Sequence, residues 1–110
     1  RPGVPVRGSR SGSPIMALFD LLGRRWAMGV LWTVCESGPA TFRILQMRCE
    51  TISTAVLNQR LKELRAARLM ERTTDGFAAT ELGRRVYADL VPMGLTAKVW
   101  AAVLEEPEPE

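Results

Sequence analysis

The sequence predicts a mainly α-helical domain that carries one small β-hairpin. Apolar residues recur at helical spacing along most of the chain, whereas residues 69–79 form two short strand-like segments around an Asp-Gly turn. The chain has 110 residues, 46% of them hydrophobic and 25% charged, which suits one domain with a modest core. We expect a disordered N-terminal arm over residues 1–12, a folded domain over 13–104 and an acidic tail over 105–110.

Five helices are expected, and ordinary helix signals delimit them. Ser13-Pro14 suits the start of the first helix, and Gly38-Pro39 ends the second. The second helix is apolar on every side, which predicts a place at the centre of the core. Pro92 lies inside the last helix and predicts a kink or a break there. The expected helices cover residues 15–22, 25–36, 43–49, 54–67 and 81–104.

The fourth helix, which Ser53 can cap, has two distinct faces. At 100° per residue, the apolar arc holds Val56, Leu57, Leu61 and Leu64, and the polar face holds Ala55, Asn58, Gln59, Lys62 and Ala66. Amide side chains can pair with base edges while cations meet phosphates, so this polar face suits the DNA major groove. A solvated surface helix would show the same pattern, and the helix alone leaves both alternatives open.

A β-hairpin is expected directly after this helix. A turn at residues 74–76 joins strands over 69–73 and 77–79, and Thr80 can cap the last helix. Helix, helix, hairpin and helix is the order of a winged helix-turn-helix, an α+β fold in which the hairpin is the wing. The sequence therefore predicts this fold.

In this order of elements the chain resembles the HxlR-type family of bacterial winged-helix transcription regulators. The resemblance covers about residues 13–104. Its motifs are Asp20-Leu21-Leu22-Gly23, Arg25-Trp26, Gly38-Pro39 with Phe42, Ile52-Ser53, the run 56–64, Leu69-Met70-Glu71-Arg72 and Thr80-Glu81-Leu82-Gly83. None of these is diagnostic alone, but their order and spacing together are specific.

The resemblance implies a sequence-specific DNA-binding regulator, expected to act as a repressor, that binds a pseudo-palindromic double-stranded operator as a homodimer. The residues expected at base edges, near the N-terminal end of the recognition helix, are Thr54, Ala55, Asn58 and Gln59. The expected phosphate contacts are Arg43, Ser53, Arg60, Lys62, Arg65, Arg72 and Thr74. Arg60 falls inside the apolar arc, so a hydrogen-bonding strut is its alternative role. Solvated charge is the alternative for Arg65.

The last helix carries more apolar residues than a small domain buries easily at its edge, which usually marks an interface. The resemblance implies a homodimer in which this helix and the first helix form much of the contact. The residues expected there are Ile15, Leu18, Met93, Val99, Trp100 and Val103. The alternative is that Trp100 and its neighbours fold back on their own core. A two-fold dimer would place two recognition helices about 34 Å apart, matching successive half-sites.

Composition excludes several function classes. The chain has no histidine, so it cannot build a Ser-His-Asp triad or a histidine-bearing zinc site, and its two cysteines cannot form a four-cysteine zinc site. Neither a GxGxxG nor a P-loop pattern occurs. We therefore expect no enzyme activity, no metal and no cofactor.

Charge and targeting patterns favour a nucleic-acid partner. Residues 1–104 hold 15 basic and 8 acidic groups, an excess of +7 that suits binding to DNA. The sequence shows neither a secretory signal nor an apolar run long enough for a membrane span. A bacterial, cytoplasmic and nucleoid-associated protein is expected.

The chain departs from the family pattern at several positions. Ser13 stands where many relatives have a cysteine, so no thiol switch is expected there, and Cys35 and Cys49 are expected to be core residues. Arg43 stands where relatives commonly place a capping serine, which predicts a lost cap, and Ala55 where they often have a lysine. The hairpin tip is also short.

These departures keep two alternatives open. One is a winged-helix module that binds proteins, with its groove-facing helix retired. The other is a sensor in which a small-molecule effector enters between the second and last helices, near Trp26, Trp32 and Trp100. Core packing is the simpler account of these three tryptophans.

Overall fold

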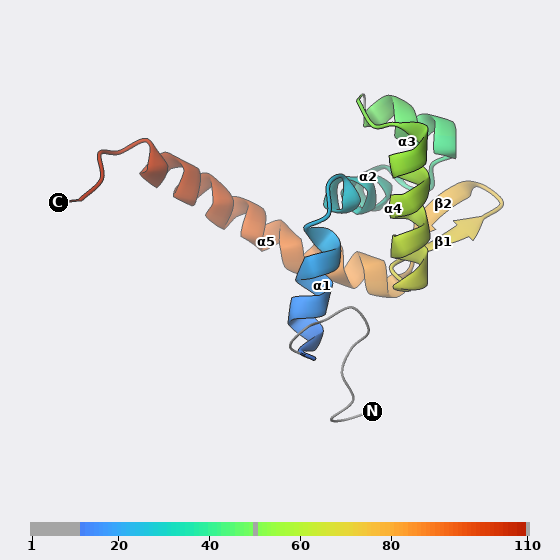
Figure 1. Ribbon diagram of the computed structural model, residues 1–110, viewed down its shortest axis with the longest axis horizontal. Helices are drawn as coiled ribbons and strands as arrows, with labels where there is room; N and C mark the ends of the chain where they lie inside the picture. Colours follow the sequence, from blue (N-terminus) through green and yellow to red (C-terminus); the bar gives the residue numbers. More distant parts are fainter. Residues whose placement is uncertain (1–11, 50, 110) are drawn as a thin grey trace.

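The computed structural model describes residues 12–49 and 51–109, so most of the expected N-terminal arm lies outside the described residues. In chain order its elements are α1 (Pro14–Leu22), α2 (Ala27–Ser37), α3 (Phe42–Arg48), α4 (Thr54–Ala66), β1 (Met70–Thr73), β2 (Gly76–Ala79) and α5 (Glu81–Leu104). Figure 1 shows α3 and α4 together at one end of the domain, with the antiparallel β1–β2 hairpin beside α4. The predicted winged helix-turn-helix is confirmed.

Helix α2 lies at the centre of the core, as its uniformly apolar sequence predicts. It contacts the other four helices and β2. Ala27 and Val30 are completely buried, and Leu31 is 1% exposed. Burial of each such Val or Leu side chain contributes roughly 1.5–3 kcal/mol. The other elements therefore pack around α2.

The start of α2 differs from the prediction, because Trp26 adopts a left-handed backbone with φ of 75°. The helix was expected from Arg25 but begins at Ala27. A left-handed conformation costs a residue with a side chain about 1–2 kcal/mol. Contacts offset this cost: Trp26 packs on the core, and the Arg25 guanidinium lies 5.4 Å from its ring centroid. The turn depends on tertiary contacts that local sequence does not reveal.

The structure corrects two further expectations about helices, namely the lost cap of α3 and the break of α5 at Pro92. Arg43 does not leave α3 uncapped, because the Thr41 hydroxyl accepts a hydrogen bond from the Ile44 N–H at 3.2 Å. Helix α5 is not broken at Pro92 but runs without interruption from Glu81 to Leu104. Pro92 has no N–H to donate to the carbonyl of Ala88, and Ala88 is exposed, so water can reach that carbonyl.

The wing is joined to the chain segment that enters α3. β1 and β2 pair from Met70↔Ala79 to Thr73↔Gly76, and Ala40 forms a separate antiparallel bridge to Phe77. The Ala40 N–H donates to the Phe77 carbonyl at 2.9 Å, and the Phe77 N–H donates back at 2.7 Å. Gly76 has φ of 118°, and a Cβ there would lie 2.5 Å from the Ala40 carbonyl oxygen. Only glycine allows this approach.

Helix α5 extends away from the rest of the domain over its C-terminal half (Figure 1). Val99, Trp100 and Val103 are 66%, 63% and 54% exposed. The alternative in which Trp100 folds back on its own core is therefore not what the structure shows. Within the described residues, no helix has the length and hydropathy that a membrane span requires.

We predict that Gly76→Ala lowers the free energy of unfolding by at least about 2 kcal/mol, because it adds both a strained φ and a clash with Ala40. Gly29→Ala is the matched control, since a Cβ at this position in α2 meets nothing within 4 Å. The control should be neutral or stabilising by up to about 1 kcal/mol. Urea unfolding of both variants measures the difference, and equal stability of the two variants would contradict the account of the wing.

Candidate DNA-binding surface

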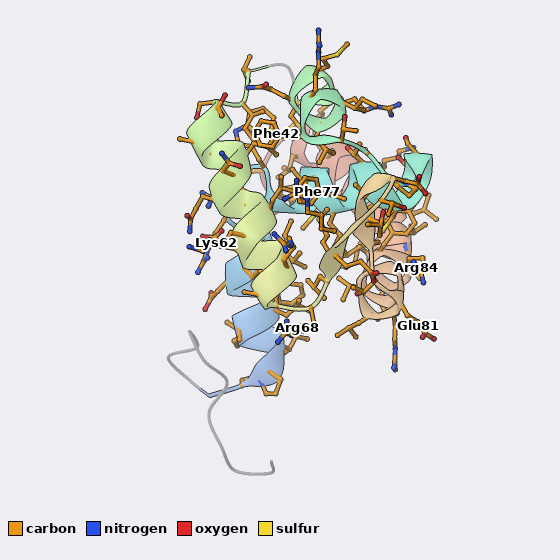
Figure 2. The ribbon with its side chains drawn as sticks, turned by 90° about the vertical axis from the view of Figure 1, so that its right-hand side faces the viewer. Phe42, Lys62, Arg68, Phe77, Glu81 and Arg84 are labelled. Atoms are coloured by element: carbon orange, nitrogen blue, oxygen red, sulfur yellow. The ribbon has the colours of Figure 1, made fainter. Side chains whose placement is uncertain are left out.

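Helix α4 has the two faces that the sequence predicts. Leu57 and Leu64 are completely buried and Leu61 is 3% exposed, which fixes the inner face against the core. Thr54, Ala55, Asn58 and Gln59, the predicted base-contacting residues, are all exposed, and we call this set the reading face. Figure 2 shows Lys62 on the outer side of the same helix, pointing away from the body of the domain. The predicted base contacts therefore lie together on one accessible surface.

The N-terminal end of α4 is held by two side-chain hydrogen bonds. The Ser53 hydroxyl accepts from the Val56 N–H at 3.1 Å and so caps the helix, as predicted. Gln46 on α3 donates its amide N–H to the Thr54 hydroxyl at 2.9 Å, a contact that sequence reasoning missed. The Asn58 amide makes no hydrogen bond within the described part of the chain. Asn58 is thus the reading-face amide that is available at once to a base.

Gln59 is engaged within its own helix. Its amide nitrogen donates to Glu63 Oε2 at 2.9 Å. The amide oxygen is left as an acceptor on the exposed surface. The second N–H of the amide is left as a donor, and the bond to Glu63 restricts the orientations in which Gln59 can present its donor and acceptor to adenine.

Glu63 pairs with several neighbouring side chains at once, which sequence analysis did not predict. It forms ion pairs with Arg24 at 2.8 Å and with Arg60 at 2.9 Å, and its side chain is 16% exposed. Partial burial by itself would raise the pKa of the Glu63 carboxyl, but hydrogen bonds from Gln59 and Arg24 and the charges of Arg24 and Arg60 hold it below its ordinary value. The spacing of Arg60 and Gln59 from Glu63 was a usable signal.

Within the protomer, Arg60 forms a hydrogen-bonding strut, the alternative role that the sequence suggested. Its Nε donates to the Arg25 carbonyl at 2.8 Å, and its Nη1 donates to Glu63 at 2.9 Å. These bonds tie the turn that precedes α2, with its left-handed Trp26, to the recognition helix. A phosphate contact by Arg60 would require this network to open and stays untested.

Three cations on α3 and α4 are free to contact DNA. Arg43, Lys62 and Arg65 are exposed, and within the described residues none of them makes an ion pair or hydrogen bond. On the wing, Arg72 lies 5.5 Å from the Phe77 ring centroid, and Thr74 is exposed in the turn. These residues come from α3, α4 and the hairpin, as a backbone-contacting rim requires.

The remaining sequence candidates divide clearly. Ile15, Met93, Val99, Trp100 and Val103 are all more than half exposed. Leu18, in contrast, is partly buried and packs against the core of its own protomer. All of the expected interface residues except Leu18 are therefore exposed apolar residues.

Burial affects both cysteine thiols, and the described cysteine and acidic side chains form no close cluster. Burial raises the pKa of the Cys35 and Cys49 thiols, although the charge of Arg84 lowers that of Cys35 in part. Both thiols are therefore poor nucleophiles at neutral pH. Between residues 12 and 109, leaving out residue 50, no three cysteine or acidic side chains gather closely enough to hold a metal ion.

The cavity that the structure shows lies elsewhere than the expected effector site, which stays a prediction. This cavity of about 610 Å³ lies between α1, α4 and α5, and none of the tryptophans lines it. Trp26 packs on the core, and Trp32 makes an edge-to-face contact with Tyr87 at 4.8 Å between ring centroids. Packing, the simpler account, holds for these two residues, whereas Trp100 is exposed.

Known proteins share this fold and sequence pattern. A family model described as HxlR-like helix-turn-helix matches residues 21–104. The chain is 30% identical to the quinone-bound YodB of B. subtilis, with a TM-score of 0.72 over 76% of this chain and 94% of that one. A possible HxlR family transcriptional factor from Thermoplasma volcanium GSS1 is 26% identical, with a TM-score of 0.67 over 82% and 86% of the two chains.

A curated relative from Halalkalibacterium halodurans, an uncharacterised HTH-type transcriptional regulator, is 32% identical over 60 residues. The match covers 54% of this chain, and the chain spans about half the length of that relative, 53%. The family match extends over most of the chain and includes α2 to α5. The chain therefore belongs to the HxlR-like helix-turn-helix family, a family of DNA-binding transcriptional regulators rather than of enzymes.

Proposed function

We propose that this chain is a homodimeric repressor that places α4 in the major groove of a pseudo-palindromic operator. One observation carries the proposal: the buried leucines of α4 turn its short polar side chains outward, at the exposed N-terminal end of the helix. Thr54, Ala55, Asn58 and Gln59 then approach base edges. A protein with this function acts at the nucleoid, within the bacterial cytoplasm.

Phosphate contacts come from the rim around this surface. Arg43 on α3, Lys62 and Arg65 on α4, and Arg72 on the wing are exposed cations on the elements that flank the reading face. The hydroxyls of Ser53 and Thr74 can add neutral contacts, because each can still donate its proton. The two-residue wing turn limits the hairpin to backbone contacts.

The dimer rests on the exposed apolar surfaces of α1 and α5. Ile15, Met93, Val99, Trp100 and Val103 together expose more apolar surface than one protomer of this size normally leaves in water. A second copy is the natural cover, since two-fold association buries the same surface on both chains. The two copies of α4 would then meet successive major grooves of one operator.

The rival function is a protein-interaction module with a retired recognition helix. Ala55, which lacks the lysine common in relatives, and the short wing favour it. The unpaired cations Arg43, Lys62 and Arg65 favour DNA, because a surface that has lost its polyanionic partner gains nothing from uncompensated charge.

We predict salt-sensitive binding to the genomic segment upstream of the coding sequence. If four cations of each protomer meet phosphates, the dimer neutralises eight phosphates, and the logarithm of the association constant should fall with the logarithm of salt concentration at a slope of about −7. Lys62→Ala should reduce this slope by about 2, because the change removes one contact from each protomer. Titration by fluorescence anisotropy at several salt concentrations measures both quantities.

Two controls belong to this titration. Lys98→Ala removes an exposed lysine from α5, away from α4, and should leave the slope unchanged. A scrambled segment of the same composition should bind at least tenfold more weakly. Weak and equal binding to both segments would support the interaction module instead.

Asn58→Ala should weaken operator binding by about 1–3 kcal/mol and relax the sequence preference at one base pair of each half-site. Gln59→Ala should relax the preference at a neighbouring pair that offers an amino donor, because its free oxygen is an acceptor. Binding to a library of singly substituted operators measures both effects, with Lys98→Ala again as the control. If neither variant changes the preference, the orientation assigned to α4 on DNA is wrong.

A further inference from the structure

We propose that the cavity between α1, α4 and α5 binds a small amphipathic cation, an amine or ammonium group on an apolar body, and that the occupant acts on the reading face through Glu63. At about 610 Å³ the cavity has the size of an ordinary ligand site. Its walls are mainly apolar and include Ala17, Leu21, Ala67, Leu69 and Val86. Such walls suit the hydrocarbon part of a ligand.

Charge at the cavity selects a cation. Three ionisable residues line it, namely Asp20, Arg24 and Glu63. Arg24 is neutralised by its ion pair with Glu63, whereas Asp20 has no ion pair or hydrogen bond within the described residues. An anion would be repelled by the carboxylates of Asp20 and Glu63, whereas Arg24, whose charge Glu63 already offsets, would attract it only weakly. An ammonium group would gain a charge-assisted hydrogen bond with Asp20.

A second copy of the chain can cover a different side of α1, although Leu18, one of the expected interface residues, also lines the cavity. At 100° per residue, Ile15 and Phe19 project from the side of α1 opposite to Ala17 and Leu21. Ile15 and Phe19 are 58% and 43% exposed, and they belong to the apolar surface that the dimer would cover. Dimerisation through that side leaves the cavity to a small molecule.

Glu63 connects the cavity to the reading face. The same carboxylate oxygen, Oε2, accepts from Arg24 at 2.8 Å and from Gln59 at 2.9 Å. A cation close to Glu63 competes with both donors and so releases the Gln59 amide nitrogen. Released Gln59 can change its rotamer, which alters how its amide donor and acceptor meet a base edge. This coupling rests on the proposed function, whereas ligand binding does not.

Titration calorimetry of the full chain without DNA tests the site with three probes of one shape: 4-phenylbutylamine, 4-phenylbutan-1-ol and 4-phenylbutyrate. The amine should bind saturably and at least tenfold more tightly than the alcohol, and the butyrate more weakly than both. Asp20→Asn should remove the preference for the amine. Asp89→Asn, an exposed carboxylate on α5 outside the cavity, is the matched control and should bind as the wild type.

Ala66→Phe provides an independent test, because it fills the cavity from the exposed end of α4 without touching a charge. It should abolish amine binding while circular dichroism shows an intact helical fold. Undetectable amine binding to the wild type, equal binding of amine and alcohol, or wild-type binding by Asp20→Asn would each overturn the site.

The coupling is tested by titrating operator variants with and without saturating 4-phenylbutylamine. The amine should change the discrimination between adenine and other bases at the Gln59 position about fivefold or more. Gln59→Ala should abolish this change. If the amine binds but discrimination is unaltered, the coupling is wrong and the site stands. If the chain does not bind DNA at all, the proposed function fails. Calorimetry without DNA still tests whether the cavity binds the amine.

Discussion

The packing of Leu57, Leu61 and Leu64 into the core is the constraint on which the rest of the DNA-binding surface depends. These side chains lie against an assembly organised around α2, and all three are nearly or completely buried. Turning α4 enough to expose them would cost several kcal/mol in lost apolar burial. Asn58 and Lys62 are therefore kept outward by hydrophobic burial on the opposite face. The outer face can vary in sequence without disturbing the fold.

A second, polar layer sets the detailed position of the same helix. Arg60 reaches from α4 to the Arg25 carbonyl, and Glu63 collects Arg24, Arg60 and Gln59 on one carboxylate. Ion pairs of this partly exposed kind contribute modestly to stability, so their main consequence is geometric. They join the turn before α2 to a residue of the reading face. A change at one end of this network therefore has a short physical route to the other.

Much of the fold could be predicted from sequence because its signals are local. The two faces of α4, the Ser53 and Thr80 caps and the Asp-Gly hairpin each follow from residues close together in the chain. The left-handed Trp26, the Gln46–Thr54 hydrogen bond and the position of the cavity depend on segments brought together by folding. Glu63 lies between these cases, since its spacing from Gln59 and Arg60 was visible but Arg24 was not. The features that local sequence does not predict therefore lie where separate helices contact one another.

The central claim is that the outer face of α4 enters the major groove in two copies. Methylation interference on the upstream segment tests it most directly, because dimethyl sulfate marks guanine N7 in the major groove and adenine N3 in the minor groove. The account predicts that guanine N7 methylation blocks binding in two clusters whose centres lie about 34 Å apart on one side of the duplex. Interference confined to adenine N3, or absent from the bound segment, would contradict it.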